Sequence, residues 1–426
     1  MLFMDILILF SAILSSSWII LQGAYYTDKV IMDKLNGSFS FRVSIIVAVK
    51  DEPKELIEKL VENLSRIEYD NYEVIIVSDD SEEKFEELKA LPVPPNFSLF
   101  RRDFQGGRKA GALNYGIEKS TGEILIFLDS EARVEPDFLS RILPYMNKYE
   151  AVAMRLRIRN PESKLQRLYS EMTDFSMNSL FKGRWLRGLP IFPNGSAFSI
   201  RKETVVKVGY WREGIIAEDL EMGIRLFLKG VTVAYADDVV VETLAPFSWK
   251  DLFEQMKRWA YGSGQLMIYS LSMARKGIKG IEGIIYANQW GIYPLFILML
   301  LIAGLVYPFL TSSILAWIFG LSIFLLSSFL LSIRSRMEEY DIRIPTLMLT
   351  AFLTGYFLGA LRTKFKWKVT PKIGINDDLW IPWEVNLISF LFLLAGTLDI
   401  TGEDLVRDVT HGAILLIISL IVLAIP

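Results

Sequence analysis

The sequence predicts an α/β domain with a mostly parallel sheet, inserted between transmembrane helices. Three observations lead to this class. Long apolar runs lie near both ends of the chain, and between them short runs rich in β-branched residues alternate with helical stretches. In addition, 52% of the 426 residues are hydrophobic while 22% are charged. That composition is too apolar for an ordinary soluble enzyme and too charged for a membrane bundle alone.

The first apolar run predicts a membrane anchor. Leu2 to Leu21 is about 20 residues of nearly continuous apolar sequence, enough to cross a hydrocarbon core of ~30 Å. Asp5 lies near the start of this run, whereas Lys29, Lys34 and Arg42 follow it. A cleaved signal peptide would carry its positive charge first. We therefore expect an uncleaved helix with its amino end outside and the next domain in the cytoplasm.

The middle of the chain predicts the parallel sheet. Three short apolar runs are continuous, as strands buried on both faces require: 43–50, 73–78 and 123–128. Between the first two, Lys54 to Ile67 places Leu56, Leu60 and Leu64 on one face of a helix. Strands separated by helices favour parallel pairing.

Acidic residues follow each of these strands. They are Asp51 with Glu52, Asp79 with Asp80, and Asp129 with Glu131. A single acid after a strand is most often a turn former or a helix cap. Ligands of open α/β sheets, however, bind outside the carboxyl ends of the strands. Three acidic strand ends, joined by the later pair Glu218 and Asp219, therefore predict one acidic crevice.

The C-terminal third predicts further membrane segments. Its apolar runs are 284–309, 314–333, 344–361, 381–400 and 409–426. The positive-inside rule places the basic segment 362–372 in the cytoplasm, but that segment would lie outside if every earlier run crossed the membrane. The conflict disappears if 344–361, which contains Pro345, Gly355 and Gly359, lies in the interface. We therefore expect a multi-pass protein of the cytoplasmic membrane with five spans and one interfacial segment.

These patterns divide the chain into four parts. Residues 1–40 are an anchor and linker, 41–245 the α/β domain, 246–282 amphipathic interfacial helices, and 283–426 a membrane region with a basic loop at 362–384. The net charge is −3, and no basic stripe with interleaved aromatic residues is present in the sequence. We therefore expect membrane lipid, and not nucleic acid, as a partner.

Composition limits which metal the α/β domain can hold. The chain has no cysteine, and its only histidine, His411, lies in the C-terminal apolar region. A metal in the soluble part must therefore be held by oxygen ligands, which favours Mg²⁺ or Mn²⁺. Asp129 and Glu131, separated by Ser130, point to the same side of an extended segment. Such a pair can hold an ion that bridges a nucleotide diphosphate.

A glycine-rich turn adds cations. Residues 106–114 combine glycines with Arg108 and Lys109, which suits a close approach to phosphate. A flexible loop at the start of a helix would have the same composition. The turn lacks the Walker pattern, so phosphoryl transfer gains no support from it.

Gln255, Arg258 and Trp259 share one face of a predicted helix. Their amide can bond hydroxyl groups, their guanidinium can grip a diphosphate by two parallel bonds, and their indole can underlie a sugar ring. An amphipathic helix lying on lipid could carry the same spacing. Together with the upstream acids, the three residues favour sugar transfer from a nucleotide at a membrane surface.

With these motifs, the chain resembles glycosyltransferase family 2, specifically the membrane-integrated branch of cellulose, hyaluronan and related polysaccharide synthases. The resemblance extends from about Val43 to Lys372. The family's motifs fall on Ala48–Glu52, Asp79–Asp80, Lys109–Gly111, Asp129–Glu131, Ala217–Asp219, Gln255–Trp259 and Trp367–Lys372. The chain departs from the family pattern in having Glu131 for a second Asp, Ala217 for Thr, and Trp367 for Phe.

The resemblance implies a GT-A fold for the α/β domain and a role for each motif. The catalytic residues would be Asp219, as the base, and Glu218. The metal ligands would be Asp129 and Glu131, and the acceptor site would contain Asn194, Gln255 and Trp259. The nucleotide sugar would be held by Ala48, Glu52, Asp79, Asp80, Lys109, Ser130, Arg258, Thr370 and Lys372, the last two in a gating loop.

The sequence thus predicts an inverting, metal-dependent enzyme that moves sugar from a UDP-linked donor to a growing polysaccharide, with the spans as an exit path. GDP-mannose stays open as a donor. A transferase that adds one sugar to a lipid would share the Gln-x-x-Arg-Trp motif; the expected gating loop favours the polymer, and the small number of spans leaves the lipid open. A non-catalytic channel subunit would be expected to have lost acids from the crevice, and here they all persist.

Overall fold

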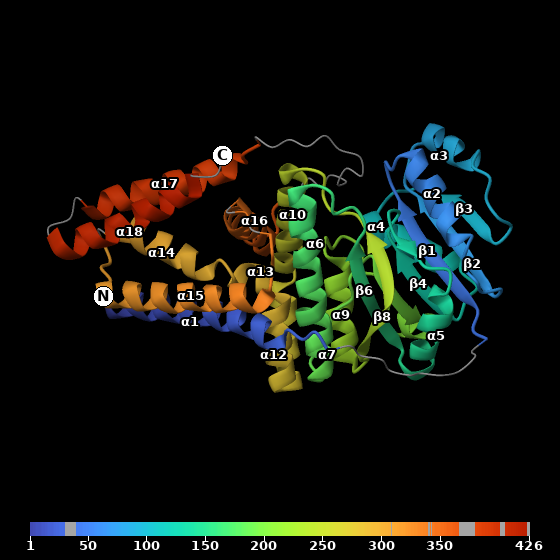
Figure 1. Ribbon diagram of the computed structural model, residues 1–426, viewed down its shortest axis with the longest axis horizontal. Helices are drawn as coiled ribbons and strands as arrows, with labels where there is room; N and C mark the ends of the chain where they lie inside the picture. The colour runs from blue at the N-terminus through green and yellow to red at the C-terminus, as the bar shows by residue number, and fades with distance from the viewer. Residues whose placement is uncertain are drawn as a thin grey trace.

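The computed structural model describes residues 1–29, 40–307, 309–339, 341, 343–365, 380–400 and 405–423. Figure 1 shows a sheet-containing domain at one end of the molecule and a group of long helices at the other, with a layer of crossing helices between them. The first helix belongs to the long-helix end, the chain then forms the α/β domain, and it returns to the long-helix end to finish.

The described part of the α/β domain is built on one eight-stranded sheet, in the order β3-β2-β1-β4-β7-β6-β8-β5. The strands are β1 (Val43–Val49), β2 (Tyr72–Ser78), β3 (Phe97–Arg101), β4 (Ile124–Leu128), β5 (Arg133–Val134), β6 (Ala151–Ile158), β7 (Ala197–Arg201) and β8 (Val233–Thr243). β1 pairs in parallel with β2 and β4, β2 with β3, and β6 with β8, which confirms the predicted mostly parallel sheet. The antiparallel pairs that β7 makes with β4 and β6, and β5 with β8, were not predicted.

Helices cover both faces of this sheet (Figure 1). One face carries α2 (Lys54–Leu64), α3 (Glu82–Lys89) and α5 (Phe138–Lys148), and the other carries α4 (Arg108–Lys119), α8 (Lys202–Val208) and α9 (Glu218–Lys229). Successive strand residues alternate between the two cores: Ile45 and Val47 belong to the core with Leu60 of α2, and Ile46 to the core with Leu113 of α4. Burial on both faces explains why these strands are continuous apolar runs.

The strand register brings three carboxyl ends together. Val49 at the end of β1 pairs with Ser78 of β2, and Val47 of β1 pairs with Leu128 of β4. The acidic residues that follow these strands therefore lie along one edge of the sheet, which is where ligands of open α/β sheets bind.

A layer of shorter helices joins the two ends of the molecule. It contains α6 (Lys164–Ser176), the π-helix η1 (Met177–Gly183), α7 (Arg184–Leu186), α10 (Trp249–Gln265), α11 (Met267–Ser270), η2 (Leu271–Lys276), α12 (Ile278–Ala287), α13 (Gln289–Ile292) and α16 (Arg343–Ala360). The helices α10 and α16 touch through backbone atoms. A Cβ added to Gly355 would meet the carbonyl oxygen of Lys257, and one added to Gly359 would meet that of Tyr261. The two glycines therefore set the closeness of this helix pair.

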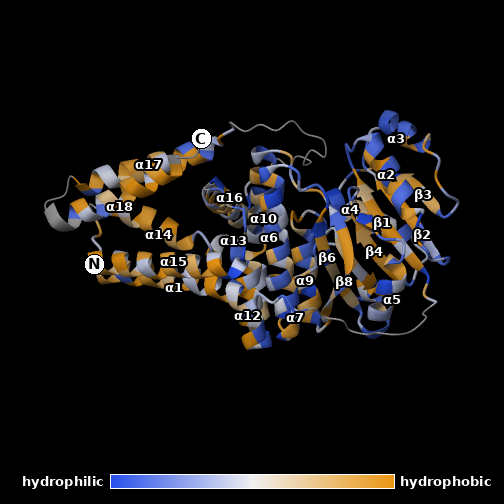
Figure 2. Ribbon diagram, viewed as in Figure 1, coloured by the Kyte–Doolittle hydropathy of each residue, from blue (hydrophilic) through white to orange (hydrophobic). Residues whose placement is uncertain are grey.

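The long-helix end contains α1 (Leu2–Tyr25), α14 (Leu295–Val306), α15 (Ile314–Ser335), α17 (Trp383–Ile400) and α18 (Leu405–Leu423). Within the described residues, α1, α15 and α17 are long and apolar enough to cross a membrane, with mean hydropathies of 2.0, 2.4 and 1.5. α14 and α18 are also apolar but contribute shorter stretches. Hydrophobic residues predominate along these helices, whereas the helices and loops of the α/β domain carry more polar residues (Figure 2). Large hydrophobic side chains of the long helices, such as Phe10, Phe329 and Phe390, are exposed. The predicted total of five spans stays a prediction.

Candidate active site

Lys109 lies at the centre of a group of carboxylates at the acidic edge of the sheet. It stands in the first turn of α4, directly after the left-handed turn at Gly107 (φ 78°), which aims the helix start at the strand ends. The Lys109 Nζ donates to Asp129 Oδ1 at 2.6 Å and to the Gly195 carbonyl at 2.9 Å. It also lies 3.7 Å from Glu218 Oε1. Three predicted site residues, from the starts of α4 and α9 and the end of β4, are thereby brought together.

Asp219 joins this group from the first turn of α9. Its Oδ2 accepts the Gly195 N–H at 2.9 Å and its Oδ1 accepts the Leu220 N–H at 2.7 Å. A carboxylate in the first turn of a helix is also favoured by the helix dipole. A Cβ added to Gly195 would lie 3.2 Å from Asp219 Oδ2 and 3.3 Å from Lys109 Nζ. The glycine thus lets the backbone pass between the lysine and the predicted base.

The surplus of carboxylates shifts their proton affinities. Burial raises the pKa of Glu218, Lys109 lowers it and Asp219 raises it again, with a result of about 7. Burial also raises the pKa of Asp219 against the opposing effect of Lys109. For Lys109, burial lowers the pKa, but the carboxylates of Asp129 and Glu218 outweigh it, so the ammonium group stays charged. A carboxyl group that titrates near neutrality is suited to accept a proton.

Arg258 reaches the same group from α10. Burial lowers the pKa of its guanidinium, while the carboxylates of Glu218, Asp129 and Glu131 act in the opposite direction. These interactions show that the guanidinium shares the field of the acidic edge. Arg258 of the helical motif therefore interacts electrostatically with acids that are far from it in the sequence.

Gln255 and Trp259 lie beside aromatic side chains that were not predicted. Burial raises the pKa of the Tyr169 hydroxyl on α6, and the nearby Gln255 and Arg258 side chains lower it. Trp259 stacks on Trp290 of α13, with ring centroids 5.8 Å apart and planes at 28°. Nothing in the sequence marked Tyr169, because an aromatic residue at helical spacing predicts a packing position first.

The predicted metal ligands have different surroundings. The side chain of Asp129 is 29% exposed and is bound to Lys109. Glu131 is buried, accepts a bond of 3.3 Å from the Ser130 hydroxyl, and lies near Arg159. Within the described residues, no group of three or more His, Asp or Glu side chains is arranged to hold a metal. Two carboxylates one residue apart nevertheless fit Mg²⁺ or Mn²⁺ in kind, if the remaining ligands come from substrate and water.

The residues predicted to bind the nucleotide after β1 are tied to the end of β2. Asp80 accepts the Asp51 N–H at 2.6 Å and the Ser78 hydroxyl at 2.8 Å. These bonds hold Asp51 at a φ of 57°, which is costly for a residue with a side chain and therefore needs such support. Ala48 is half-buried in β1, and Glu52 lies half-buried in the turn that Asp80 holds.

Asp79, the other acid after β2, is bound to an arginine that was not predicted. Both of its oxygens accept from the guanidinium of Arg102, at 2.7 and 2.5 Å. Both side chains are buried. A charged residue in a charged loop carries no distinct sequence signal, which is why Arg102 was missed.

Of the remaining predicted residues, the structure describes Asn194 but not Thr370 and Lys372. Asn194, beside Gly195, donates to the Met154 carbonyl at 3.2 Å, and its own Oδ1 is buried without a hydrogen-bond partner among the described residues. Thr370 and Lys372 of the predicted gating loop lie outside the described residues.

A further unpredicted side chain, Asn114 of α4, ties the glycine-rich region to the segment that leads into α9. Its amide donates to the Trp211 carbonyl at 2.9 Å, and its oxygen accepts the Trp211 N–H at 2.9 Å. The amide also donates to Glu213 at 3.2 Å. The helix that carries Lys109 is thereby fixed against the chain that carries Glu218.

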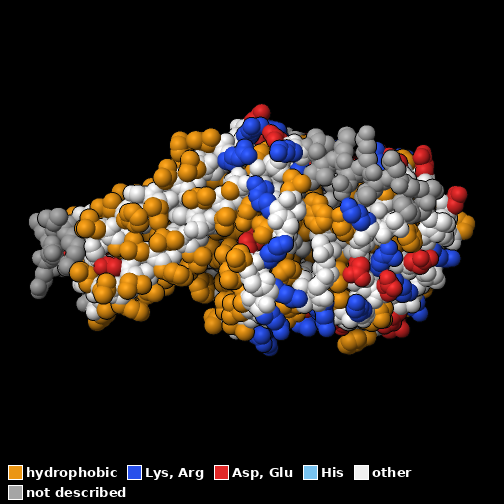
Figure 3. All heavy atoms as spheres, turned by 90° about the horizontal axis from the view of Figure 1, so that it is seen from below, with side chains coloured by type: hydrophobic (Ala, Val, Ile, Leu, Met, Phe, Trp, Pro, Cys, Tyr) orange, Lys and Arg blue, Asp and Glu red, His pale blue; other side chains and the backbone are white. Residues whose placement is uncertain are grey.

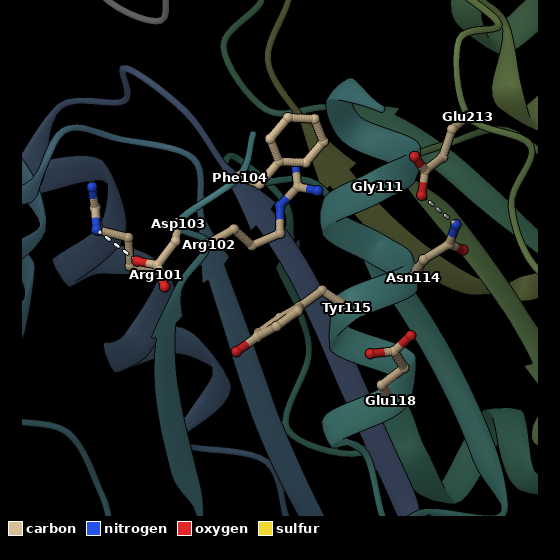
Figure 4. Close-up of a pocket in the computed structure, with 9 residues that line it drawn as sticks. All are labelled: Arg101, Arg102, Asp103, Phe104, Gly111, Asn114, Tyr115, Glu118 and Glu213. Carbon is tan, nitrogen blue, oxygen red and sulfur yellow. Dashed lines mark hydrogen bonds and ion pairs between the residues drawn. The ribbon is translucent and has the colours of Figure 1, made fainter. Parts of the chain in front are cut away.

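A cavity of about 290 Å³ lies on the outer side of α4 (Figure 4). It is lined by Arg101, Arg102, Asp103, Phe104, Gly111, Asn114, Tyr115, Glu118 and Glu213. The carboxylates around Lys109 do not line it, so it is a neighbour of the acidic edge and not its opening.

Comparison with known sequences identifies relatives of this chain. Residues 124–359 match the family described as "Glycosyl transferase family group 2". A probable glycosyltransferase of Sulfolobus acidocaldarius is 28% identical over 389 residues, which are 84% of each chain. A poly-β-1,6-N-acetyl-D-glucosamine synthase of Staphylococcus aureus is 26% identical over 276 residues, which are 62% of this chain and 66% of that one.

Comparison of structures gives a matching fold. A mannosyltransferase from Pyrobaculum calidifontis, solved in complex with GDP-Man and Mn²⁺, superposes with a TM-score of 0.55 at 17% identity. The match covers 85% of this chain and 99% of that one. The likeness supports the predicted GT-A-like arrangement of the α/β domain.

Proposed function

This chain belongs to glycosyl transferase family group 2 and is a glycosyltransferase, and on that premise we propose that it moves sugar, with inversion, from a UDP-linked donor to the end of a growing polysaccharide. Because the chain is a glycosyltransferase, the alternative of a non-catalytic channel subunit is rejected. The observation that carries the proposal is the convergence of Lys109, Asp129, Glu218 and Asp219 at one sheet edge, with Arg258 in the same field.

Asp219 is the proposed base. The acceptor hydroxyl oxygen attacks the anomeric carbon, its proton passes to the Asp219 carboxylate, and the bond to the diphosphate oxygen breaks with its electron pair on the leaving group. The raised pKa of Asp219 and of its neighbour Glu218 supports this role, because a stronger base takes the proton more readily. The bonds from the Gly195 and Leu220 N–H groups keep Asp219 oriented, and each carboxylate oxygen retains a second lone pair that can accept the proton.

Lys109 and Arg258 are the proposed partners of the diphosphate. Both are cations within a group of acids, so each can exchange a carboxylate for a phosphate oxygen. Asp129 and Glu131 would hold Mg²⁺ or Mn²⁺, which neutralises charge that develops on the leaving phosphate. Ser130, between these two acids, belongs to the same proposed subsite.

The acceptor side is proposed to include Trp259, Gln255 and Asn194. A growing polysaccharide is the favoured acceptor because a relative over 62% of this chain is a poly-N-acetylglucosamine synthase. The predicted gating loop with Thr370 and Lys372, the cytoplasmic placement of the α/β domain and an exit path between the spans belong to the same proposal. Figure 3 supports the placement, since Lys and Arg side chains gather where the apolar helices meet the α/β domain.

A lipid acceptor is the second candidate, and one observation favours it. The helix α10, which carries Gln255, Arg258 and Trp259, packs along α16 at the border of the apolar helices. A lipid headgroup lying at that border would come within reach of the motif without any exit path.

The product distinguishes these candidates. The purified full-length chain is incubated with radiolabelled UDP- and GDP-sugars and Mn²⁺, and the product is sized. A polymer from a UDP-sugar supports the proposal, and a lipid-sized product supports the second candidate. No transfer from any nucleotide sugar, in a preparation that is folded, would contradict both.

A further inference from the structure

We propose that Arg102 is a positioning residue that determines which donor is accepted. By occupying both oxygens of Asp79, it excludes a two-point contact between that acid and a guanine base and leaves room for a base with a single ring N–H, such as uracil. This inference rests on the proposed function and on the expectation, implied by the family resemblance, that Asp79 is one of the residues that hold the nucleotide sugar.

The geometry of the pair is that of two parallel bonds. The Arg102 Nε donates to Asp79 Oδ1 at 2.7 Å, and its Nη2 donates to Asp79 Oδ2 at 2.5 Å. The two side chains are 8% and 5% exposed, so water does not compete for these bonds. A guanidinium bound in this way uses the inward-facing lone pair of each carboxylate oxygen. Only the outward-facing lone pairs of Asp79 remain for a ligand.

The arginine is also fixed on its other side. Its Nη1 donates to the Gly106 carbonyl at 2.9 Å, and its Nη2 donates to the Arg108 carbonyl at 3.3 Å. A Cβ added to Gly111 would lie 2.5 Å from the Arg102 Nη1, so the guanidinium lies directly against α4. Figure 4 shows Arg102 and Gly111 among the residues that line the cavity beside α4. Arg102 therefore cannot leave Asp79 without giving up the turn that leads to Lys109.

Guanine and uracil differ in the N–H groups that they present, so this arrangement discriminates between the two bases. Guanine presents two adjacent N–H groups on one edge, and the carboxylate that recognises both must offer its two oxygens from the same side. That side of Asp79 is occupied. Uracil presents one N–H between two carbonyl groups, which a single outward lone pair of an ionised carboxylate can accept. A site that leaves a polar group of the ligand unpaired discriminates strongly against that ligand.

The test compares binding of free UDP and GDP, with Mn²⁺, to the purified full-length chain by calorimetry. We expect UDP to bind on the order of 10-fold more tightly than GDP in the natural chain, the effect of one unmatched hydrogen bond. Arg102→Lys keeps the charge but cannot form two parallel bonds. We expect this variant to bind UDP more weakly and to bring the ratio of the two dissociation constants within about threefold of unity. The reason is that the side of Asp79 that Arg102 occupies in the natural chain becomes available to a base.

Arg101→Lys is the matched control, because Arg101 is the neighbouring arginine and bonds to the Asp80 carbonyl and Asp103 instead of to Asp79. It should keep the natural ratio. Thermal melting of each variant separates loss of folding from loss of selection. If Arg102→Lys does not fold, Arg102→Gln takes its place, since a single amide group cannot form both parallel bonds to Asp79 and should also lower the ratio.

Two results would overturn the inference while leaving the enzyme a glycosyltransferase. One is GDP binding as tightly as UDP in the natural chain. The other is an unchanged ratio in a folded Arg102→Lys variant. Failure to bind either nucleotide would contradict the proposed function itself.

Discussion

The two ion-pair regions of the crevice differ in how their charges balance. At the end of β2, Arg102 faces one carboxylate, that of Asp79, and the bonds between them are complete and buried. At the start of α4, Lys109 faces two carboxylates directly, those of Asp129 and Glu218, and feels a third. The first region is balanced in charge and leaves only the outward-facing lone pairs of Asp79 for a ligand, whereas the second has an excess of negative charge.

This difference separates positioning from chemistry. A fully satisfied pair holds its neighbours in place and has little reason to change when a substrate arrives. A crowded group of acids around one cation raises the proton affinity of those acids and attracts further cations. The balanced region suits selection of the nucleoside, and the unbalanced region suits proton transfer and metal binding. Four predictions test this division, beginning with the largest expected effect.

Asp219→Asn should remove the base from the unbalanced region. We expect turnover to fall by about 10²–10⁴-fold, the range for loss of a general base, with donor affinity nearly unchanged. Steady-state transfer and calorimetric binding of the donor measure the two quantities. Asp103→Asn, the same chemical change at a fully exposed carboxylate, is the control and should be silent. Normal turnover in Asp219→Asn would remove the assignment of the base.

Lys109→Met should remove the cation that the acids share. We expect turnover to fall by about 10²-fold, because a charge-assisted contact to the diphosphate is lost. The pH at which activity appears should also move upward, since Lys109 lowers the pKa of Glu218 and Asp219 in the natural chain. Lys119→Met, on the exposed side of the same helix, controls for helix propensity. A lower or unchanged activity midpoint would show that Lys109 does not act on these acids.

The natural enzyme should gain activity as pH rises through neutrality, because the acids must be ionised to accept a proton. Below the midpoint of the activity profile, the gain should be up to ~10-fold per pH unit. Glu218 titrates at about 7 in the folded chain and at 4.5 when unperturbed. Its folded state thus binds the proton more tightly, so its contribution to stability is present below pH 4.5 and is lost as pH rises to about 7. Thermal melting across this window checks the sign. A melting temperature that rises with pH in the natural chain and not in Glu218→Gln would contradict it.

Tyr169→Phe should have the smallest effect. It removes a hydroxyl at the margin of the unbalanced region, so we expect a loss of about 1 kcal/mol, or roughly fivefold, in kcat/KM. Tyr115→Phe removes a hydroxyl from the outer cavity and serves as the control. Equal effects of the two substitutions would show that Tyr169 only packs.

Much of the unbalanced region followed from the sequence, because parallel strands that end in acids must present them at one edge. The prediction that Asp129, Glu218 and Asp219 share one crevice needed only the fold class and the motifs, whereas the bond from Lys109 to Asp129 is seen only in the structure. The balanced region did not follow. Asp79 was expected to face the nucleotide. Which residue binds Asp79 depends on how the loop after β3 folds back, and no hydrophobic periodicity in the sequence marks Arg102 as that residue.

The same limit applies to the antiparallel strands. β7 enters the sheet between β4 and β6, which is a long-range pairing that local patterns do not encode. Its entry matters for the site, because Gly195 comes just before β7 and contributes both its N–H and its carbonyl to Asp219 and Lys109. The sequence shows a glycine followed by an apolar run, but it does not show which residues this glycine contacts in space.

The close backbone contact between α10 and α16 has a mechanical consequence. Where two helices meet at glycines, interlocked main chains resist sliding, so the pair tends to tilt or shift as one strut. Arg258 lies on α10, and Gly359 lies near the end of α16, the other helix of the pair. A force applied to α16 would therefore be transmitted to Arg258, the proposed partner of the diphosphate.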